Sequence, residues 1–317
     1  MKITLGRQIE EIKKKDSENE KNLLKNRNSD ELNEVDADDI YFHSNTIKNI
    51  KLGSNTVNRI YLNNSIVYEL QDAIDLNLFH SLVPQTATSI IFDKIENQVI
   101  TNYNLVGYCD ANNHIAVYNN STSYLVLNIR NADNFAPVSC INFFRNYSQI
   151  RSLKFLNFNT DNVTDMRSMF NTCSSLTTLD LRNFNTENVI YMNSMFYFCA
   201  KLTSLNVSSF NTNNVISMSI MFYICESLTT LDLRNFNTEN VNQMGAMFFG
   251  SKKLQKIISN TFNVSKVTSS YSMFQGCNVL KGGNGTTYNS SHINSEYARV
   301  DGENGLPGYF TAPANNK

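Results

Sequence analysis

Long apolar runs and export signals are missing from this chain. No stretch of about 18 consecutive apolar residues occurs, so the sequence predicts no membrane-spanning helix. The first 15 residues contain no apolar segment with a small-residue cleavage site, and the last ten contain no hydrophobic tail. We therefore expect no membrane insertion and no export by the general secretory route.

An excess of charge of one sign is also missing. The chain carries 27 lysines and arginines against 28 acidic residues, for a formal net charge of -1. Domains that bind nucleic acid carry a basic surplus, and solvating tails carry an acidic one. The composition therefore predicts no nucleic-acid partner.

Groups that support catalysis are scarce. The four histidines have no metal-ligand spacing to one another or to a cysteine, and none lies inside the repeats described below: His43, His80, His114 and His292. Cys109, Asp110 and His114 are too close in sequence to resemble a nucleophilic set assembled from separate segments. The glycine-rich segment 282–285 reads as a turn. We predict no catalytic residue, no metal site and no cofactor, and we keep a cytosolic enzyme as the alternative class.

What the sequence does contain is a 26-residue repeat. Leu176 and Leu228 each begin the segment LTTLDLRNFNTEN, and Leu202 begins the related LTSLNVSSFNTNN midway between them. The pair Met-Phe recurs five times in the same register, ending at Phe170, Phe196, Phe222, Phe248 and Phe274. A fixed period of this length is the signature of a stacked repeat architecture.

Each repeat has two halves. The segment from Leu176 to Leu181 alternates apolar and polar residues, which predicts a short strand. The second half places Val189, Met192 and Cys199 on one face of an expected helix. A strand and a helix in 26 residues predict an α/β repeat solenoid, a right-handed leucine-rich-repeat array with a parallel sheet.

The apolar columns predict the core of this array. Phenylalanine stands where the common repeat consensus has asparagine, so we expect a spine of phenylalanines in place of an asparagine ladder. The cysteines of successive repeats should be buried, reduced thiols, because Ser251 interrupts their series and no C-x-x-C pair occurs. The predicted core comprises Leu179, Phe184, Val189, Met192, Phe196, Cys199, Leu205, Phe210, Val215, Phe222, Leu231 and Phe236.

The exposed strand positions predict a binding surface. In a parallel stack they form columns of hydroxyls, of carboxylates or amides, and of guanidiniums. Such columns suit a polar partner, although the same residue types also occur on ordinary solvent-exposed strands. The predicted binding residues are Thr178, Asp180, Arg182, Ser204, Asn206, Ser208, Thr230, Asp232 and Arg234.

The repeats of residues 150–280, with units such as LDLRNFNTENV and the recurring Met-Phe and Cys, resemble the BspA-like leucine-rich repeats of bacterial surface proteins. Residues 282–311 are similar to the segment that ends many such arrays, and residues 89–93 and 138–153 resemble the region that precedes them. The resemblance implies a repeat fold and a binding or adhesion role. The shorter segment IKNIKLGSNTVNRIYLNNSI resembles the starts of phage and prophage structural proteins.

These patterns divide the chain into five expected parts. They are a charged helical or disordered arm (1–40), a small β-hairpin module (41–72), an N-terminal cap with a degenerate first repeat (73–149), the repeats (150–280) and a C-terminal cap with tail (281–317).

The function that we predict is non-catalytic binding to a host-cell or extracellular surface protein or glycan. The N-terminal residues would attach the chain to a larger assembly. The missing export signal favours a phage or prophage virion component, and the alternative is a BspA-like bacterial cell-surface adhesin. The expected location is the virion, the cell surface or the extracellular space.

Overall fold

The computed structural model describes residues 76–93, 102–109, 115–127, 137 and 139–314 with their side chains, and elsewhere the backbone of the strands named below. The chain divides into two compact units, residues 1–71 and 72–317. The boundary between the two units therefore lies beside the end of the predicted hairpin module at residue 72.

In the N-terminal unit the described residues form short strands. Five of them form one sheet in the order β2-β3-β4-β6-β7, in which β6 and β7 are an antiparallel pair, and β1 pairs with β5. The strands are β1 (Ile3–Leu5), β2 (Ile9–Ile12), β3 (Leu23–Arg27), β4 (Asp39–Phe42), β5 (Ile50–Leu52), β6 (Arg59–Leu62) and β7 (Ser65–Glu69). The described parts of the predicted arm are thus strands and not a helix, because β2 and β3 pair with each other. The rest of the arm lies outside the described residues.

The second unit begins with a mixed sheet that covers the first repeat. Its strand order is β10-β11-β12-β9-β14, and β14 pairs in parallel with β9. The elements are β8 (Ala73–Ile74), α1 (Leu76–Leu82), β9 (Ser89–Lys94), β10 (Asn104–Tyr108), β11 (Ile115–Asn120), β12 (Ser123–Asn128), β13 (Ala136–Pro137) and β14 (Ser152–Phe155). Phe79 of α1 and Phe92 of β9 are fully buried and pack against Phe143, which closes the core at this end.

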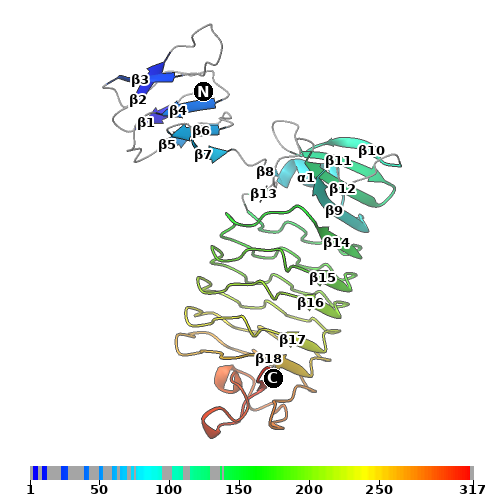
Figure 1. The fold of residues 1–317 in the computed structure, drawn as a ribbon. Helices are drawn as coiled ribbons and strands as arrows, with labels where there is room; N and C mark the ends of the chain where they lie inside the picture. Colours follow the sequence, from blue (N-terminus) through cyan, green and yellow to red (C-terminus); the bar gives the residue numbers. More distant parts are fainter. Residues whose placement is uncertain are drawn as a thin grey trace. The chain divides into compact units, whose positions relative to one another are not determined.

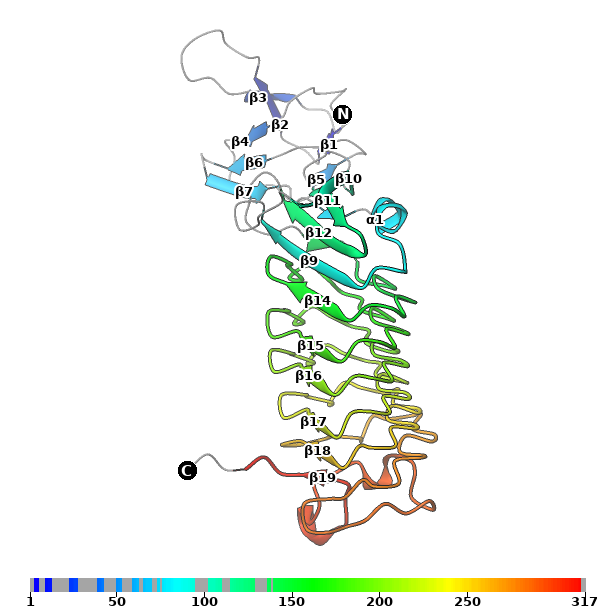
Figure 2. The same cartoon turned by 90° about the vertical axis from the view of Figure 1, so that its right-hand side faces the viewer.

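Below this sheet the 26-residue repeats lie on top of one another (Figures 1 and 2). We call each layer a rung, and rungs one to five begin at residues 150, 176, 202, 228 and 254. Each rung contributes one short strand to the same side: β14, β15 (Thr178–Asp180), β16 (Ser204–Asn206), β17 (Thr230–Asp232) and β18 (Lys256–Ile258). Leu179 pairs in parallel register with Leu205, and Leu231 with Ile257.

The predicted α/β leucine-rich-repeat solenoid, with a strand and a helix in each repeat, is wrong. In the part of the chain that the structure describes, α1 is the one α-helix and it precedes the repeats, while the other regular elements are mainly strands in mixed sheets. The second half of each rung is a series of turns. Ser194 and Phe198 have positive φ angles of 60° and 56°, and most rungs have left-handed residues at the same two positions. Such residues interrupt an α-helix.

The hydrogen bonds explain why these turns have a spacing of apolar residues similar to that of a helix. Met195 N–H donates to Met192 O of its own rung (3.3 Å), whereas Met192 N–H donates to Ser217 O of the next rung (3.1 Å). A chain of three-residue turns places apolar side chains inward at spacings of three, much as a helix does. The bonds between rungs form only when a neighbouring rung is present. The spacing of apolar residues within one repeat therefore does not distinguish a helix from a chain of turns.

The predicted core columns nevertheless lie inside. All the predicted core residues are buried except Leu205, which is half-buried. The predicted spine, in which phenylalanine takes the asparagine position, stacks in two pairs: Phe158 on Phe184 (5.6 Å) and Phe210 on Phe236 (6.1 Å). A longer stack forms in the Met-Phe column, where the rings of Phe170, Phe196 and Phe222 have centroids 5.6 and 5.4 Å apart and nearly parallel planes. It extends back to Phe144, whose ring stacks on Phe170 at 5.5 Å.

Two columns of polar atoms join the rungs inside this core. Cys199 Sγ–H donates to Phe170 O of the preceding rung (3.2 Å), and Ser251 makes the same contact with Phe222 O through its hydroxyl (2.9 Å). Serine therefore replaces cysteine in the series without losing the bond. All six cysteines are buried thiols. A column of buried threonines, including Thr186 and Thr212, joins the rungs elsewhere in the core.

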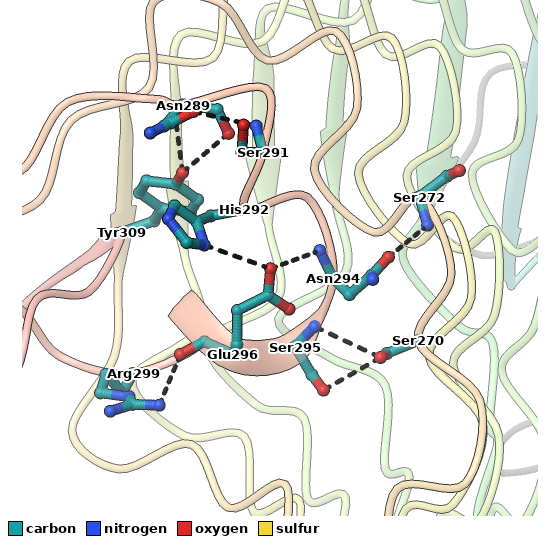
Figure 3. A network of polar contacts seen from close by, with 10 residues as sticks. All are labelled: Ser270, Ser272, Asn289, Ser291, His292, Asn294, Ser295, Glu296, Arg299 and Tyr309. Atoms are coloured by element: carbon teal, nitrogen blue, oxygen red, sulfur yellow. Dashed lines mark hydrogen bonds and ion pairs between the residues drawn. The ribbon is translucent and has the colours of Figure 1, made fainter.

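The C-terminal residues cover the fifth rung. They contain two short 3-10 helices, η2 (Ser295–Tyr297) and η3 (Glu303–Gly305), and the strand β19 (Phe310–Thr311), which pairs in parallel with β18. Tyr309 and Phe310 are fully buried against the last rung. Figure 3 shows how hydrogen bonds dock this cap: Ser295 Oγ lies 3.0 Å from Ser270 Oγ, and Ser272 N–H donates to Asn294 Oδ1 at 2.9 Å.

Candidate functional site

The predicted binding residues all lie on the strand side of rungs two, three and four. Asp180 and Asn206 stand opposite each other in the ladder that joins β15 and β16, as do Thr178 and Ser204. Their side chains are exposed or half-buried, while the intervening Leu179 is buried. The remaining predicted residues follow the same arrangement: Arg182, Ser208, Thr230, Asp232 and Arg234.

Within this surface the charges pair along the chain and not across rungs. Arg182 Nε donates to both carboxylate oxygens of Asp180 at 3.1 and 2.8 Å, and its Nη2 lies 2.6 Å from Oδ2. Arg234 forms the same fork with Asp232. The hydrogen bond from Arg182 lowers the pKa of Asp180, and that carboxylate in turn raises the pKa of Arg182. Each Asp-x-Arg unit is therefore a neutral, hydrogen-bonded pair on the surface.

The third rung separates these two pairs and carries no charge at the matching positions. Asn206 and Ser208 take the places of the aspartate and arginine, and Ser208 N–H donates to Asn206 Oδ1 at 3.1 Å. In their own rungs, Asp180 and Asp232 stabilise the same backbone turn by accepting from the N–H two residues later. The side-chain amide of Asn206 therefore keeps this turn in the third rung. The resulting surface has a neutral polar strip between two ion pairs.

The strand ladder is interrupted at this strip. Strands β15 and β16 form one sheet, and β17, β18 and β19 form another, so β16 and β17 are not paired in the described structure. On the opposite side of the same two rungs, Ser217 and Gln243 remain joined by a parallel bridge. Rungs three and four are therefore held together on the turn side and separated on the strand side.

The separation forms a slot of about 210 Å³ between the two rungs. Asn206, Ser208, Asp232 and Arg234, all predicted from the sequence, line it. Leu205, Val207 and Asn235 also line it and were not predicted as binding residues, although Leu205 was predicted as a core residue. One sequence signal points to the slot: Val207 and Ser208 stand where both neighbouring rungs have leucine and arginine, so less side-chain volume fills this layer.

Backbone groups at the slot lack the partners that the equivalent groups have between rungs two and three and between rungs four and five. Leu181 N–H donates to Asn206 O (2.9 Å), and Leu233 N–H donates to Ile258 O (2.8 Å). The equivalent bond from Val207 N–H to Asp232 O is absent from the described hydrogen bonds. Asn235 Nδ2 donates to Ser208 O and closes one end of the slot. A buried N–H without a partner is costly, so the slot presents hydrogen-bonding capacity that a bound group can use.

A second hollow, of about 630 Å³, lies in the C-terminal cap and is lined in part by Asn289, Tyr288 and Tyr297. Its polar groups already serve the cap. Asn289 N–H donates to the hydroxyl of Tyr309 at 2.9 Å (Figure 3). Tyr297 stacks on His292 with ring centroids 4.4 Å apart. These contacts support a structural role for the cap network.

The four histidines, considered as candidate catalytic groups, lie in different parts of the chain, and Cys109 lies near one of them, His114, in sequence. No group of three or more histidine, cysteine, aspartate or glutamate side chains among the described residues is placed to hold a metal ion. His80 Nε2 lies 2.9 Å from Phe143 O, and Cys109 is buried. Asp110, His114 and His43 lie outside the described residues. No helix in the described part is long and apolar enough to cross a bilayer.

The fold and the surface define a class: a protein of stacked 26-residue repeats, capped at both ends, with a polar strand side. Residues 138–231 and 200–302 match the family described as Mycoplasma protein of unknown function, DUF285. Together the matches cover residues 138–302, more than half of the chain. The protein therefore belongs to this family. No curated protein and no solved structure gives a significant match.

Proposed function

We propose that this protein is a non-catalytic binding protein whose strand-side surface on rungs two to four holds a polar partner at a cell surface or in the extracellular space. The partner is a surface protein or glycan. The observation that carries the proposal is the slot, together with the two Asp-Arg forks on either side of it. A surface that only needed to be soluble would not require a layer with missing backbone partners.

The chemistry of the forks supports a neutral, hydroxyl-rich or amide-rich partner. A guanidinium held by a carboxylate keeps further N–H groups for donation, and the carboxylate keeps further lone pairs for accepting. Because each pair is already neutral, the surface does not attract ions of one sign strongly. Many hydrogen bonds of moderate strength are expected in place of one dominant contact.

The family supports the surface-adhesin form of this function. The chain belongs to a group that we relate, through its repeats, to BspA-like bacterial surface proteins. None of the matches includes residues 45–70, so the phage or prophage form rests on the short sequence resemblance alone. Detection of the protein on intact cells, as opposed to purified virions, separates the two.

The test is a quadruple substitution of Asp180, Arg182, Asp232 and Arg234 by alanine. We expect the fold to remain, because exposed changes typically cost about 0.5 kcal/mol or less each. Binding to intact cells and to immobilised mucin glycoprotein should fall at least about tenfold, a loss of roughly 1.4 kcal/mol. Flow cytometry and surface plasmon resonance give the two measurements.

A matched control removes two acidic and two basic side chains elsewhere: Glu187, Lys201, Glu226 and Lys252, all changed to alanine. Glu226 and Lys252 form an exposed ion pair (2.6 Å) outside the strand-side surface. This variant has the same net charge as the first and should bind like the parent. If the strand-side variant also binds like the parent, the proposed function of this surface is wrong.

A further inference from the structure

Resting on the proposed function, we propose that the slot between β16 and β17 binds the acetamido group of an N-acetylated sugar, such as an N-acetylhexosamine unit of a surface glycan. The slot offers backbone hydrogen-bonding groups above an apolar floor, and an acetamido group carries one amide and one methyl. The amide of the ligand would therefore meet the backbone groups, and its methyl group would meet the apolar floor.

The donors and acceptors come from the interrupted ladder. In the paired layers an amide N–H of one rung meets a carbonyl of the next, as Leu181 N–H meets Asn206 O. The equivalent bond from Val207 N–H to Asp232 O is absent from the described hydrogen bonds, and both residues line the slot. An acetamido oxygen can accept from Val207 N–H while its N–H donates to Asp232 O. The ligand amide thereby connects the two backbone groups, which do not bond to each other directly.

The apolar floor receives the methyl group. Leu205 is half-buried and Val207 is buried, and both line the slot. Burial of one methyl group strengthens binding by about fourfold. A plain hexose has a hydroxyl in place of the acetamido group and lacks both the methyl and the amide oxygen.

The size of the slot selects a single ring substituent over a peptide strand. Its volume of about 210 Å³ equals roughly seven water molecules at about 30 Å³ each. A peptide that paired with both β16 and β17 would need a strand's separation of about 4.8 Å on each side over several residues. The sugar ring itself would lie outside, against Asn206, Ser208 and the Asp232–Arg234 fork.

The experiment uses the full chain with labelled leucine and valine methyl groups and three probes: N-acetylglucosamine, N-acetylgalactosamine and N-acetylmannosamine. We expect at least one probe to shift the methyl resonances of Leu205 and Val207 with saturable binding. The parent hexoses (glucose, galactose and mannose) should bind at least tenfold more weakly. Absence of shifts with all three probes overturns the proposal, and so does equal binding of the parent hexoses.

A second variant tests the location. Val207→Leu with Ser208→Arg gives the third rung the residues of its neighbours and fills the slot, so the fold should tolerate it and sugar binding should fall at least tenfold. The control Thr177→Arg adds the same charge to an exposed site outside the slot and should bind like the parent. Undiminished sugar binding by the filled variant, or a stronger response to N-acetylated glycine amide than to the sugars, overturns the proposal. The filled variant leaves Asp180, Arg182, Asp232 and Arg234 unchanged, so its effect on sugar binding is measured separately from the effect of the quadruple substitution on glycoprotein binding.

Discussion

At the residue scale, the turns of each rung place ordinary side chains in a left-handed backbone conformation. Ile224 has a φ of 53°, which is unfavourable for a β-branched residue. The same position holds Asn146 one rung before the repeats and Gly250 and Gly276 in rungs four and five, residue types that tolerate this conformation. The stack therefore holds Ile224 against its own preference.

This strain predicts that Ile224→Asn stabilises the protein. Left-handed backbone costs about 1–2 kcal/mol for most residues, and the loss of a half-buried side chain offsets part of the relief. We expect the free energy of unfolding to rise by about 0.5–1 kcal/mol in urea denaturation. Ile216→Asn is the control, because Ile216 is also half-buried but its φ is not positive. Stability should fall there, and equal effects at the two sites would show that strain is not the cause.

At the scale of the element, side chains supply hydrogen bonds that hold one rung to the next. Thr212 Oγ1 accepts from Asn237 N–H and donates to Asn237 O, with both distances 2.8 Å. Thr186 does the same for Asn211. These threonines are buried, so water does not replace them. The short strands alone would leave these backbone groups of the next rung unpaired.

Removal of one such hydroxyl should be costly. Thr212→Val keeps the shape but removes these partners from the part-buried N–H and C=O of Asn237, at about 1–3 kcal/mol for each group that water does not reach. We expect a loss of about 2–4 kcal/mol in chemical denaturation. Thr203→Val is the same change at an exposed site whose hydroxyl donates to Thr177 O at 3.0 Å, and it should cost about 0.5 kcal/mol or less. Similar losses in both variants would contradict the ladder's role.

At the scale of the whole molecule, stability depends on how the stack is closed. Asp301 is buried in the C-terminal cap and accepts four hydrogen bonds: from Asn284 N–H (2.8 Å), Thr286 N–H (3.0 Å), the Thr286 hydroxyl (2.6 Å) and Gly308 N–H (3.2 Å). Burial by itself raises the pKa of Asp301, but these hydrogen bonds together outweigh it and the pKa is lowered from 3.8. Gly282 passes so close that an added Cβ would lie 2.6 Å from Oδ2.

The lowered pKa predicts how the cap responds to acid. The folded state favours the charged carboxylate, so its contribution is fully present above pH 3.8 and is lost as the pH falls through the lower pKa of the folded state. Asp301→Asn should therefore reduce the melting temperature at pH 7, and the difference from the parent should shrink below about pH 4. The exposed Glu303→Gln is the control and should change neither value much. A difference between parent and Asp301→Asn that stays constant down to pH 2.5 would contradict the assignment.

The sequence alone determined the period and the buried columns, because these depend on which residues recur every 26 positions. The burial of the phenylalanine and cysteine columns follows from that register. Tertiary structure decided between helix and turns, since Met192 N–H finds its acceptor in the next rung and not in its own.

Tertiary structure also decided the form of the candidate site. Sequence reasoning placed Asp180 and Arg182 on one exposed surface but read them as separate columns, whereas the fork between them depends on side-chain rotamers. The slot depends on the distance between β16 and β17, which results from the packing of whole rungs on both sides. Hydrogen bonds between layers are properties of the stack, and no single repeat contains the information that sets them.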